Sequence, residues 1–245
     1  MFRKILMAFT AVAVLAFPLA IFATRMDWIH FRTGFGWIQY GVIIAVIIFL
    51  LGTVVGFAKA KSSPELARVA RTCSMLCLLP ILILGNQFYQ VQSLPAIHNI
   101  STDTENPPAF SAIVPLREEG ANPLAYTAEI AEQQLAAYPQ VKPYRSATPS
   151  NELFDTVVEV VREMGWDLVA ADKQSGLVEA TDTTLLWGFK DDVVIRLQGV
   201  DTPQGPTTQV DLRSVSRVGG SDIGANAKRI TGFLDALGER EGASN

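Results

Sequence analysis

Residues 208–217 read TQVDLRSVSR, and side chains of different character alternate along this run. Successive side chains of a β-strand point to opposite faces of a sheet, so the run predicts a strand with two unlike faces. The two sets are Val210, Leu212, Ser214 and Ser216 on one face, and Asp211, Arg213, Val215 and Arg217 on the other.

Three further strand-like runs precede this one, and short breaks suited to hairpins separate them. An apolar helical stripe runs from Leu153 to Met164 before the strands, and another from Ile223 to Leu237 follows them. The order α-β-β-β-β-α predicts an α+β domain, in which helices cover one face of a four-stranded antiparallel meander. The three runs are WDLVAAD (166–172), LVEATDTTLLWGF (177–189) and DDVVIRLQGV (191–200), and the breaks are Lys173–Gly176, Lys190–Asp191 and TPQGP (202–206).

The sequence between residues 92 and 149 differs from this core because it is rich in Pro, Asn, Ser and Thr. Its prolines exclude continuous regular structure, and only Thr127–Ala137 has the pattern of a short helix. We therefore predict three parts of the chain: a membrane part at 1–91, an irregular lead-in that wraps the core at 92–149, and the α+β core at 150–245.

Three apolar runs without charged side chains occupy the first 91 residues: Ile5–Ala23, Gly36–Phe57 and Thr72–Tyr89. Each has 18 to 22 residues, which is about the length that a helix needs to cross the ~30 Å hydrocarbon layer of a bilayer. Because lipid offers no hydrogen-bond partner to the backbone, these runs predict three transmembrane helices.

The basic residues near the three runs predict the orientation of the chain. The two segments that share one side, Met1–Lys4 and Ala58–Arg71, hold six Lys and Arg residues, whereas the opposite loop, 24–35, holds two. Loops rich in Lys and Arg stay in the cytoplasm, so the N-terminus is expected there and residues 91–245 are expected outside. The first run also resembles a cleaved signal peptide. Cleavage would leave two spans and would not move residues 91–245.

The formal net charge of −4 is divided unevenly along the chain. Residues 1–91 carry eight Lys/Arg and two Asp/Glu, which gives +6, and residues 92–245 carry twelve and twenty-two, which gives −10. Phosphate contacts need a basic field, so no nucleic-acid partner is expected for the second part. The apolar runs of the first part exclude a purely soluble enzyme.

Arginines on the charged face of the predicted sheet are the first candidates for binding. Arg196, Arg213 and Arg217 would share that face with Asp192 and Asp211. One interpretation is a guanidinium cluster that binds a carboxylate or phosphate ligand in a fork. The other is a ladder of cross-strand salt bridges, because acids and bases interleave there.

The segment SRVGGSDIGANAKR (216–229) is the second candidate. Its two adjacent glycines precede a helix whose free N–H groups can hold an anion, and Asp222, Asn226 and Arg229 would line one face of that helix. The alternative is a well-capped helix in which the negative charge of Asp222 interacts favourably with the helix dipole. The combined candidates for binding an anion or a partner are Arg196, Arg213, Ser214, Ser216, Arg217, Ser221, Asp222, Asn226, Lys228 and Arg229.

The sequence has none of the motifs that are typical of hydrolases, zinc proteases or nucleotide-binding enzymes. The GxSxG, HExxH, Walker and dinucleotide glycine patterns are absent. Residues 98–106 offer oxygen ligands for a hard cation, but without the spacing of an EF-hand. We predict no cofactor, no metal and no catalytic residue, and an enzyme is the less expected class.

Three motifs in this order resemble the DUF1499 family: IHNISTDTENPPAF (97–110), WGFKDDVVIR (187–196) and VDLRSVSRVGGSDIGANAKRI (210–230). The resemblance covers about residues 97–237, and three preceding helices are similar to the architecture of some bacterial members. It implies an exported domain with no assigned biochemical role, and it supplies no catalytic residues. Outside the candidates given above, the residues that match the family pattern are Asp103, Pro107, Pro108, Phe110, Lys190, Asp191, Asp192, Gly219 and Gly224.

These observations together lead to one expected function and two alternatives. We expect a non-catalytic binding or assembly module, anchored in a bacterial cytoplasmic (inner) membrane with its acidic domain in the periplasm. Its partners would be the lipid bilayer and either another membrane protein or an anionic small molecule. The alternatives are an enzyme that acts on an envelope lipid or cell-wall substrate, and an accessory subunit of a larger membrane complex.

Overall fold

The computed structural model of the protein describes residues 1–202 and 205–244. Pro203 and Gln204 of the TPQGP break, and Asn245, lie outside the described residues. The chain forms two compact units. The helical unit comprises Met1–Gln92 together with Leu185–Gly188, and the sheet unit comprises Ser93–Thr184 and Phe189–Asn245.

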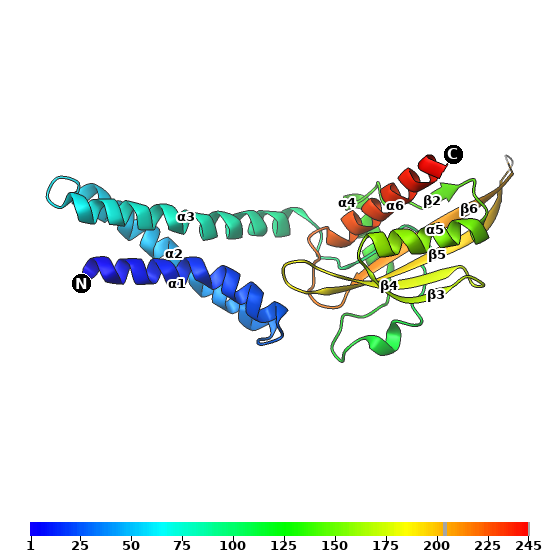
Figure 1. The fold of residues 1–245 in the computed structure, drawn as a ribbon, viewed down its shortest axis with the longest axis horizontal. Helices are drawn as coiled ribbons and strands as arrows, with labels where there is room; N and C mark the ends of the chain where they lie inside the picture. The colour runs from blue at the N-terminus through cyan, green and yellow to red at the C-terminus, as the bar shows by residue number, and fades with distance from the viewer. Residues whose placement is uncertain (203–204, 245) are drawn as a thin grey trace. The chain divides into compact units, whose positions relative to one another are not determined.

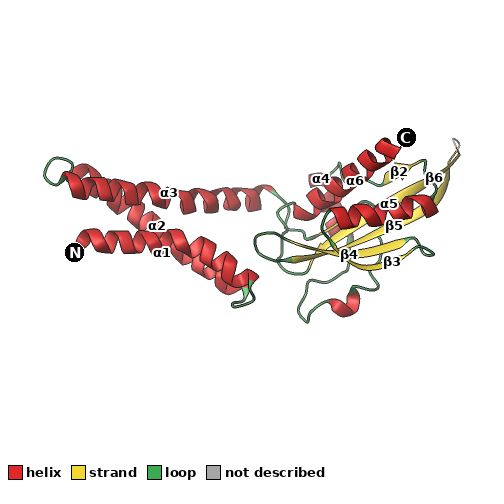
Figure 2. Ribbon diagram, viewed as in Figure 1, coloured by secondary structure: helices red, strands yellow, loops and turns green. Residues whose placement is uncertain are grey.

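The helical unit is built from α1 (Phe2–Arg25), α2 (Phe31–Ala58) and α3 (Pro64–Ser93) (Figure 2). All three helices are long and apolar enough to cross a membrane. Each extends several residues beyond the apolar run that predicted it, because the flanking polar residues continue the same backbone hydrogen bonding.

Small residues allow α2 to pack closely against both other helices. A Cβ atom at Gly41 would lie 2.6 Å from the Cβ atom of Ala16 in α1. A Cβ atom at Gly52 would lie 2.5 Å from Ser74 Oγ in α3. At Gly56, the backbone carbonyl accepts two hydrogen bonds from the Arg71 guanidinium, at 2.9 and 3.1 Å. The GxxxG pair of α2 therefore serves contact within the chain.

The sheet unit contains two short strands and a long antiparallel meander (Figure 1). Its sheet has the order β1-β6-β5-β4-β3, and β2 also pairs with β6. The elements in chain order are β1 (Asn99–Ser101), the 3₁₀ turn η1 (Val114–Leu116), α4 (Ala128–Ala137), β2 (Tyr144–Ser146), α5 (Ser150–Glu163), β3 (Asp167–Asp172), β4 (Leu177–Thr183), β5 (Lys190–Thr202), β6 (Gly205–Ser216) and α6 (Ala225–Ser244).

The prediction of four strands is wrong, because the described residues form six. The two additional strands come from the lead-in, and both pair with the free edge of β6, at residues 213–215 and 208–210. An unpaired edge would leave a row of backbone N–H and C=O groups without partners, and β1 and β2 fill it. Three-residue strands of this kind carry no periodic signal that could have predicted them.

Two predicted boundaries also need correction. The break between β4 and β5 is the loop at 184–189, and Lys190, where a break was expected, already pairs with Thr183. The last helix begins at Ala225. The sequence predicted a helix directly after the glycines of 216–229, but Asp222 is used as a cap for the turn that precedes α6.

The apolar core lies between the sheet and the two long helices α5 and α6, which cover one face of the sheet (Figure 1). Trp166, directly before β3, stacks on Phe233 of α6 with 5.5 Å between the ring centroids. The largest contributions from the two helices and the sheet are Leu153, Val157, Val160, Val161, Ile230, Phe233, Leu237, Val178, Val193, Ile195, Val210 and Leu212.

The opposite face of the sheet is covered by residues 102–126, which we call the wrap segment. The Thr102 amide donates to Leu212 O at 2.8 Å, and the Asn122 amide donates to Arg217 O at 2.8 Å, so both ends of the segment are fixed to β6 or its extension. Between them, Ile113 is fully buried. The face that the sequence marks as charged is therefore enclosed within the protein.

Candidate functional site

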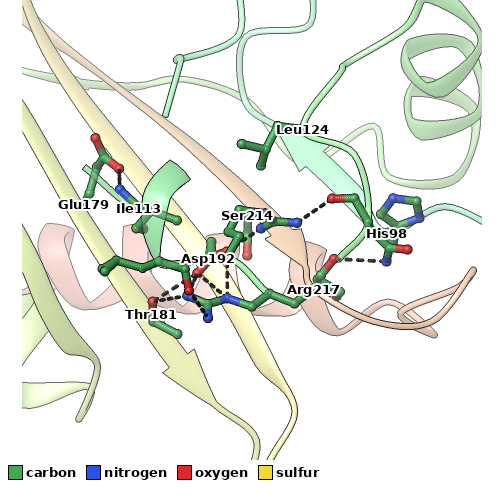
Figure 3. A network of polar contacts seen from close by, with 12 residues as sticks. His98, Ile113, Leu124, Glu179, Thr181, Asp192, Ser214 and Arg217 are labelled. Carbon is green, nitrogen blue, oxygen red and sulfur yellow. Dashed lines mark hydrogen bonds and ion pairs between the residues drawn. The ribbon is translucent and has the colours of Figure 1, made fainter. Parts of the chain in front are cut away.

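Asp192 of β5 is the central acid of the enclosed face, and its side chain is fully buried. Arg217, just beyond β6, donates to this carboxylate from Nε at 3.0 and 3.1 Å and from Nη2 at 2.8 Å (Figure 3). Arg117 of the wrap segment forms a second ion pair with Asp192. The Thr181 hydroxyl on β4 completes the set at 3.0 Å. One carboxylate thus holds two guanidinium groups.

Arg196 shows the reverse arrangement four residues further along β5. Its Nη2 donates to Asp211 of β6 and to Asp103 of the wrap segment, both at 2.9 Å. Asp103 also accepts the backbone amides of Glu105 and Asn106 at 3.1 and 2.9 Å. The oxygens of Asp103, which a cation site at residues 98–106 would have needed, are therefore bound to Arg196 and to the backbone of this turn. Among the residues that the structure describes, no group of three or more His, Cys, Asp or Glu could hold a metal ion.

Arg213 holds the wrap segment through backbone carbonyls. Its Nε donates to Asn99 Oδ1 at 3.0 Å, its Nη1 to Pro108 O at 3.1 Å, and its Nη2 to Leu124 O. The rings of Phe110 and Tyr126 face the guanidinium, at 5.3 and 5.7 Å from their centroids, in the geometry of a cation–π contact.

Burial shifts the pKa values of Arg213 and Tyr126. It lowers the pKa of Arg213 to about 10 and raises the pKa of Tyr126 to about 12. Both directions follow from the cost of a charge away from water.

Glu179 of β4 receives the middle of the wrap segment. Its Oε1 accepts the amides of Ser111 and Ala112 at 2.8 and 2.9 Å, and its Oε2 accepts the amide of Ile113 at 2.9 Å. Three backbone donors therefore satisfy the oxygens of a carboxylate that is 3% exposed. We call this set of contacts, which centres on Asp192, Arg196, Arg213 and Glu179, the wrap-side network.

The wrap-side network is balanced in formal charge. Its four cations are Arg117, Arg196, Arg213 and Arg217, and its four anions are Asp103, Glu179, Asp192 and Asp211. A site that binds an anion would need an excess of positive charge. The geometry instead gives each guanidinium a partner inside the protein.

A second polar cluster lies on the helix-covered face, near the start of α6. Arg229 of α6 pairs with Asp191 at 2.5 Å and with Asp182 at 2.7 Å. Its Nη1 also donates to Asn226 Oδ1 at 2.6 Å and to Ser214 Oγ at 3.2 Å. Burial raises the pKa of Asp191 above its usual value, and the charge of Arg229 opposes that shift.

Asn226 connects this cluster to the first residues of the sheet unit. Its Nδ2 donates to Ser216 Oγ and to His98 O, both at 3.0 Å, and its Oδ1 accepts from Ser214 Oγ at 2.7 Å. Because both ends of its amide are used, Asn226 fixes α6 to β6 and to the chain that enters β1. We call the contacts of Asn226 and Arg229 the helix-side cluster.

The turn before α6 is closed by its own side chains. Asp222 accepts the amides of Gly224 and Asn226 at 2.9 and 3.0 Å, and Ser221 Oγ accepts the amide of Ile223 at 3.3 Å. Burial raises the pKa of Asp222, while these backbone donors lower it. The amides that could have held an external anion are bound by this carboxylate.

The structure divides the sequence-predicted candidates between the two faces of the sheet. Arg196, Arg213 and Arg217 lie on the wrap side with Asp103, Pro108, Phe110 and Asp192. Ser214, Ser216, Asn226 and Arg229 lie on the helix side with Asp191. Lys228 and Lys190 are exposed, and Pro107 is half-buried. The arginines of the wrap side and the turn before α6 are therefore not brought together.

Sequence reasoning missed Arg117, Asn122 and Glu179. Arg117 lies in the stretch LREEG, whose composition is that of a solvated loop. Asn122 holds the end of the wrap segment through Nδ2 bonds to Ser216 O and Gly219 O, at 3.0 and 2.7 Å. For Glu179 a signal existed, because it alternates with Val178 and Ala180 and so faces away from the apolar core.

Comparison with known proteins adds one finding. A search of curated proteins gives no significant match. The model of the family described as "Protein of unknown function (DUF1499)" matches residues 99–237, which is more than half of the chain. That span begins at β1, ends within α6, and contains the wrap-side network and the helix-side cluster. The chain belongs to the DUF1499 family.

Proposed function

We propose that this protein is a membrane-anchored binding or assembly module that acts without catalysis and recognises a partner protein. The observation that carries the proposal is the balanced wrap-side network. Each candidate arginine is already bound by carboxylates or carbonyls of the same domain. These groups hold the domain in one shape, so recognition falls to its outer surface. This favours a protein partner over an anionic small molecule.

The proposed location is a bacterial cytoplasmic membrane, with the N-terminus in the cytoplasm and residues 91–245 in the periplasm. Its support is the basic bias of six Lys and Arg against two on the opposite loop. A second support is the placement of exposed aromatic side chains. Trp37, Tyr40, Phe88 and Tyr89 are more than 40% exposed, and all lie toward the predicted outer ends of α2 and α3, where aromatic belts occur.

Reporter fusions test this location directly. A reporter that is active only in the periplasm should be active when it is fused after Asn245, and a reporter that is active only in the cytoplasm should be inactive there. The matched control is the same pair fused after Lys61, between α2 and α3, where the opposite pattern is expected. The reversed result at both sites would show that the orientation is inverted and would reject the periplasmic proposal.

The assembly role is tested by extracting the chain from the membrane in which it was produced and measuring the size and composition of the particle that contains it. After extraction in a mild detergent, we expect it to elute with a partner protein at a defined stoichiometry. We expect that stoichiometry to survive addition of inorganic phosphate. Elution of the chain alone, together with turnover of an envelope lipid or cell-wall fragment, would support the enzyme alternative and contradict the module.

A further inference from the structure

The loop between β4 and β5 presents an unusual side-chain composition to its surroundings. Residues 185–189 read LLWGF, without a charged or hydrogen-bonding side chain other than the indole. Leu185 is 82% exposed and Leu186 is 60% exposed. Hairpin loops are normally polar and rich in turn-forming residues. Two adjacent exposed leucines at a loop tip therefore require an explanation.

The loop has a defined shape. Its base is closed by two hydrogen bonds between Thr184 and Phe189. The Thr184 amide donates to Phe189 O at 2.8 Å, and the Phe189 amide donates to Thr184 Oγ1 at 2.9 Å. Gly188 has a φ of +71°, a backbone conformation that favours glycine. The backbone is thus held so that the leucines project from it.

This loop joins β4 and β5 at the end of the sheet where the chain enters from α3. Asp191, at the start of β5, pairs with Ser216 at the end of β6. The Ser216 amide in turn donates to His98 O at 2.9 Å. The first residues of the sheet unit and the first residues of β5 therefore lie at the same end of the sheet.

The covalent link from α3 to this end of the sheet is short. The helix ends at Ser93, and Ile97 is already buried in the apolar core. Three intervening residues span at most about 10 Å when they are fully extended. The exposed rings of Phe88 and Tyr89 near the end of α3 are of the type that occupies the interfacial layer of a membrane. If α3 spans the membrane, the chain enters this end of the sheet only a few residues after it leaves that layer.

We propose that the β4–β5 loop inserts Leu185 and Leu186 into the interfacial layer of the bilayer that carries the three helices. The inference rests on the membrane anchoring proposed above. Leucine gains free energy by leaving water. Lys190 is exposed directly after the loop, so its ammonium group can pair with a headgroup phosphate once the leucines are inserted. The loop would then attach the sheet unit to the membrane at a second point, in addition to its covalent link to α3.

Lipid quenching of a fluorophore at defined positions tests this proposal. The full-length chain with Cys73→Ala and Cys77→Ala is placed in nanodiscs of phosphatidylcholine, with or without phosphatidylcholine that carries a nitroxide near the top of its acyl chain. An environment-sensitive fluorophore is attached in separate samples to Leu185→Cys, to Tyr89→Cys near the end of α3, and to Gln174→Cys. Gln174 is exposed in the β3–β4 loop, at the opposite end of the sheet.

The expected result is loss of fluorescence at Leu185→Cys comparable with the loss at Tyr89→Cys, and none at Gln174→Cys. Quenching at Tyr89→Cys without quenching at Leu185→Cys would overturn the loop proposal and leave the membrane anchoring in place. If the Leu185→Cys probe is then also shielded from a water-soluble quencher, protein covers the loop in place of lipid. Absence of quenching at Tyr89→Cys would overturn the anchoring itself.

Discussion

Replacing Asp192 with alanine is expected to destabilise the sheet unit by about 3–5 kcal/mol, because two buried guanidinium groups lose their shared counter-ion. Arg217 would retain only its contact from Nη1 to Leu116 O at 3.2 Å and a contact at 3.5 Å to the Thr181 hydroxyl. Arg117 would retain its bond to Asn122 O. Neither carbonyl carries a full negative charge. Asp192→Asn should lose nearly as much, since the amide keeps the shape of the side chain but not its charge.

Urea unfolding of the full-length chain in mild detergent measures this loss. Fluorescence of Trp166, which is buried against Phe233, reports the sheet unit when the other three tryptophans are replaced by phenylalanine in all variants. The matched control is Asp155→Ala. It removes an ion pair to Lys173 of 2.7 Å, but the two side chains are 71% and 47% exposed. Such pairs contribute about 0–1 kcal/mol. Equal losses for Asp192→Ala and Asp155→Ala would contradict the role given to Asp192.

Replacing Arg217 with alanine is expected to destabilise the sheet unit by about 1–3 kcal/mol. The loss is smaller than for Asp192→Ala because Arg117 remains to pair with the carboxylate. The bonds from Arg217 Nε and Nη2 to Asp192, and from Nη1 to Leu116 O, disappear together.

Arg217→Lys should recover only part of this loss. A single ammonium keeps the charge but cannot reproduce the fork that the guanidinium places around the carboxylate. Arg162→Lys, on the exposed surface of α5, is the control for the exchange itself and should leave stability unchanged.

The main elements of the fold could be predicted because their patterns are long. The three apolar runs become three apolar helices, and the alternation in 208–217 sorts the side chains of β6 as the register with β5 places them. The two helical stripes correspond to α5 and α6. In each case, many residues repeat one physical signal, so a single exception does not obscure it.

The sequence predicts a lead-in that wraps the core, but it does not show that this segment covers the charged face of the sheet. Residues 102–126 contain no repeated pattern, and their contacts are backbone amides and carbonyls meeting side chains far away in sequence. Glu179, for example, binds the amides of Ser111 to Ile113 across more than 65 residues. Composition marks Asp192, Arg213 and Arg217 as polar and hence as surface residues. Only the long-range pairing shows that their charges are satisfied within the protein.

The grouping of the candidate residues shows a second limit. Arg217 and Asp222 lie close in sequence, yet their side chains serve different faces of the sheet. The chain passes from the wrap-side network to the helix-side cluster within a few residues, at the glycine turn, where Gly219 has a φ of +91°. Alternation assigns faces correctly within β6. This alternation ends where β6 ends, so it does not predict the direction of the turn that follows the strand.

The melting temperature of Arg217→Ala, measured beside the wild-type chain in the same detergent, tests the central claim that the wrap-side network is structural. If the network is structural, Arg217→Ala lowers the melting temperature and Arg217→Lys restores part of it. Binding sites hold unneutralised charge at a cost to stability, so removing such a charge leaves stability unchanged or raises it. An unchanged or raised melting temperature for Arg217→Ala, with function lost in the cell, would contradict a structural role and identify Arg217 as part of a binding site.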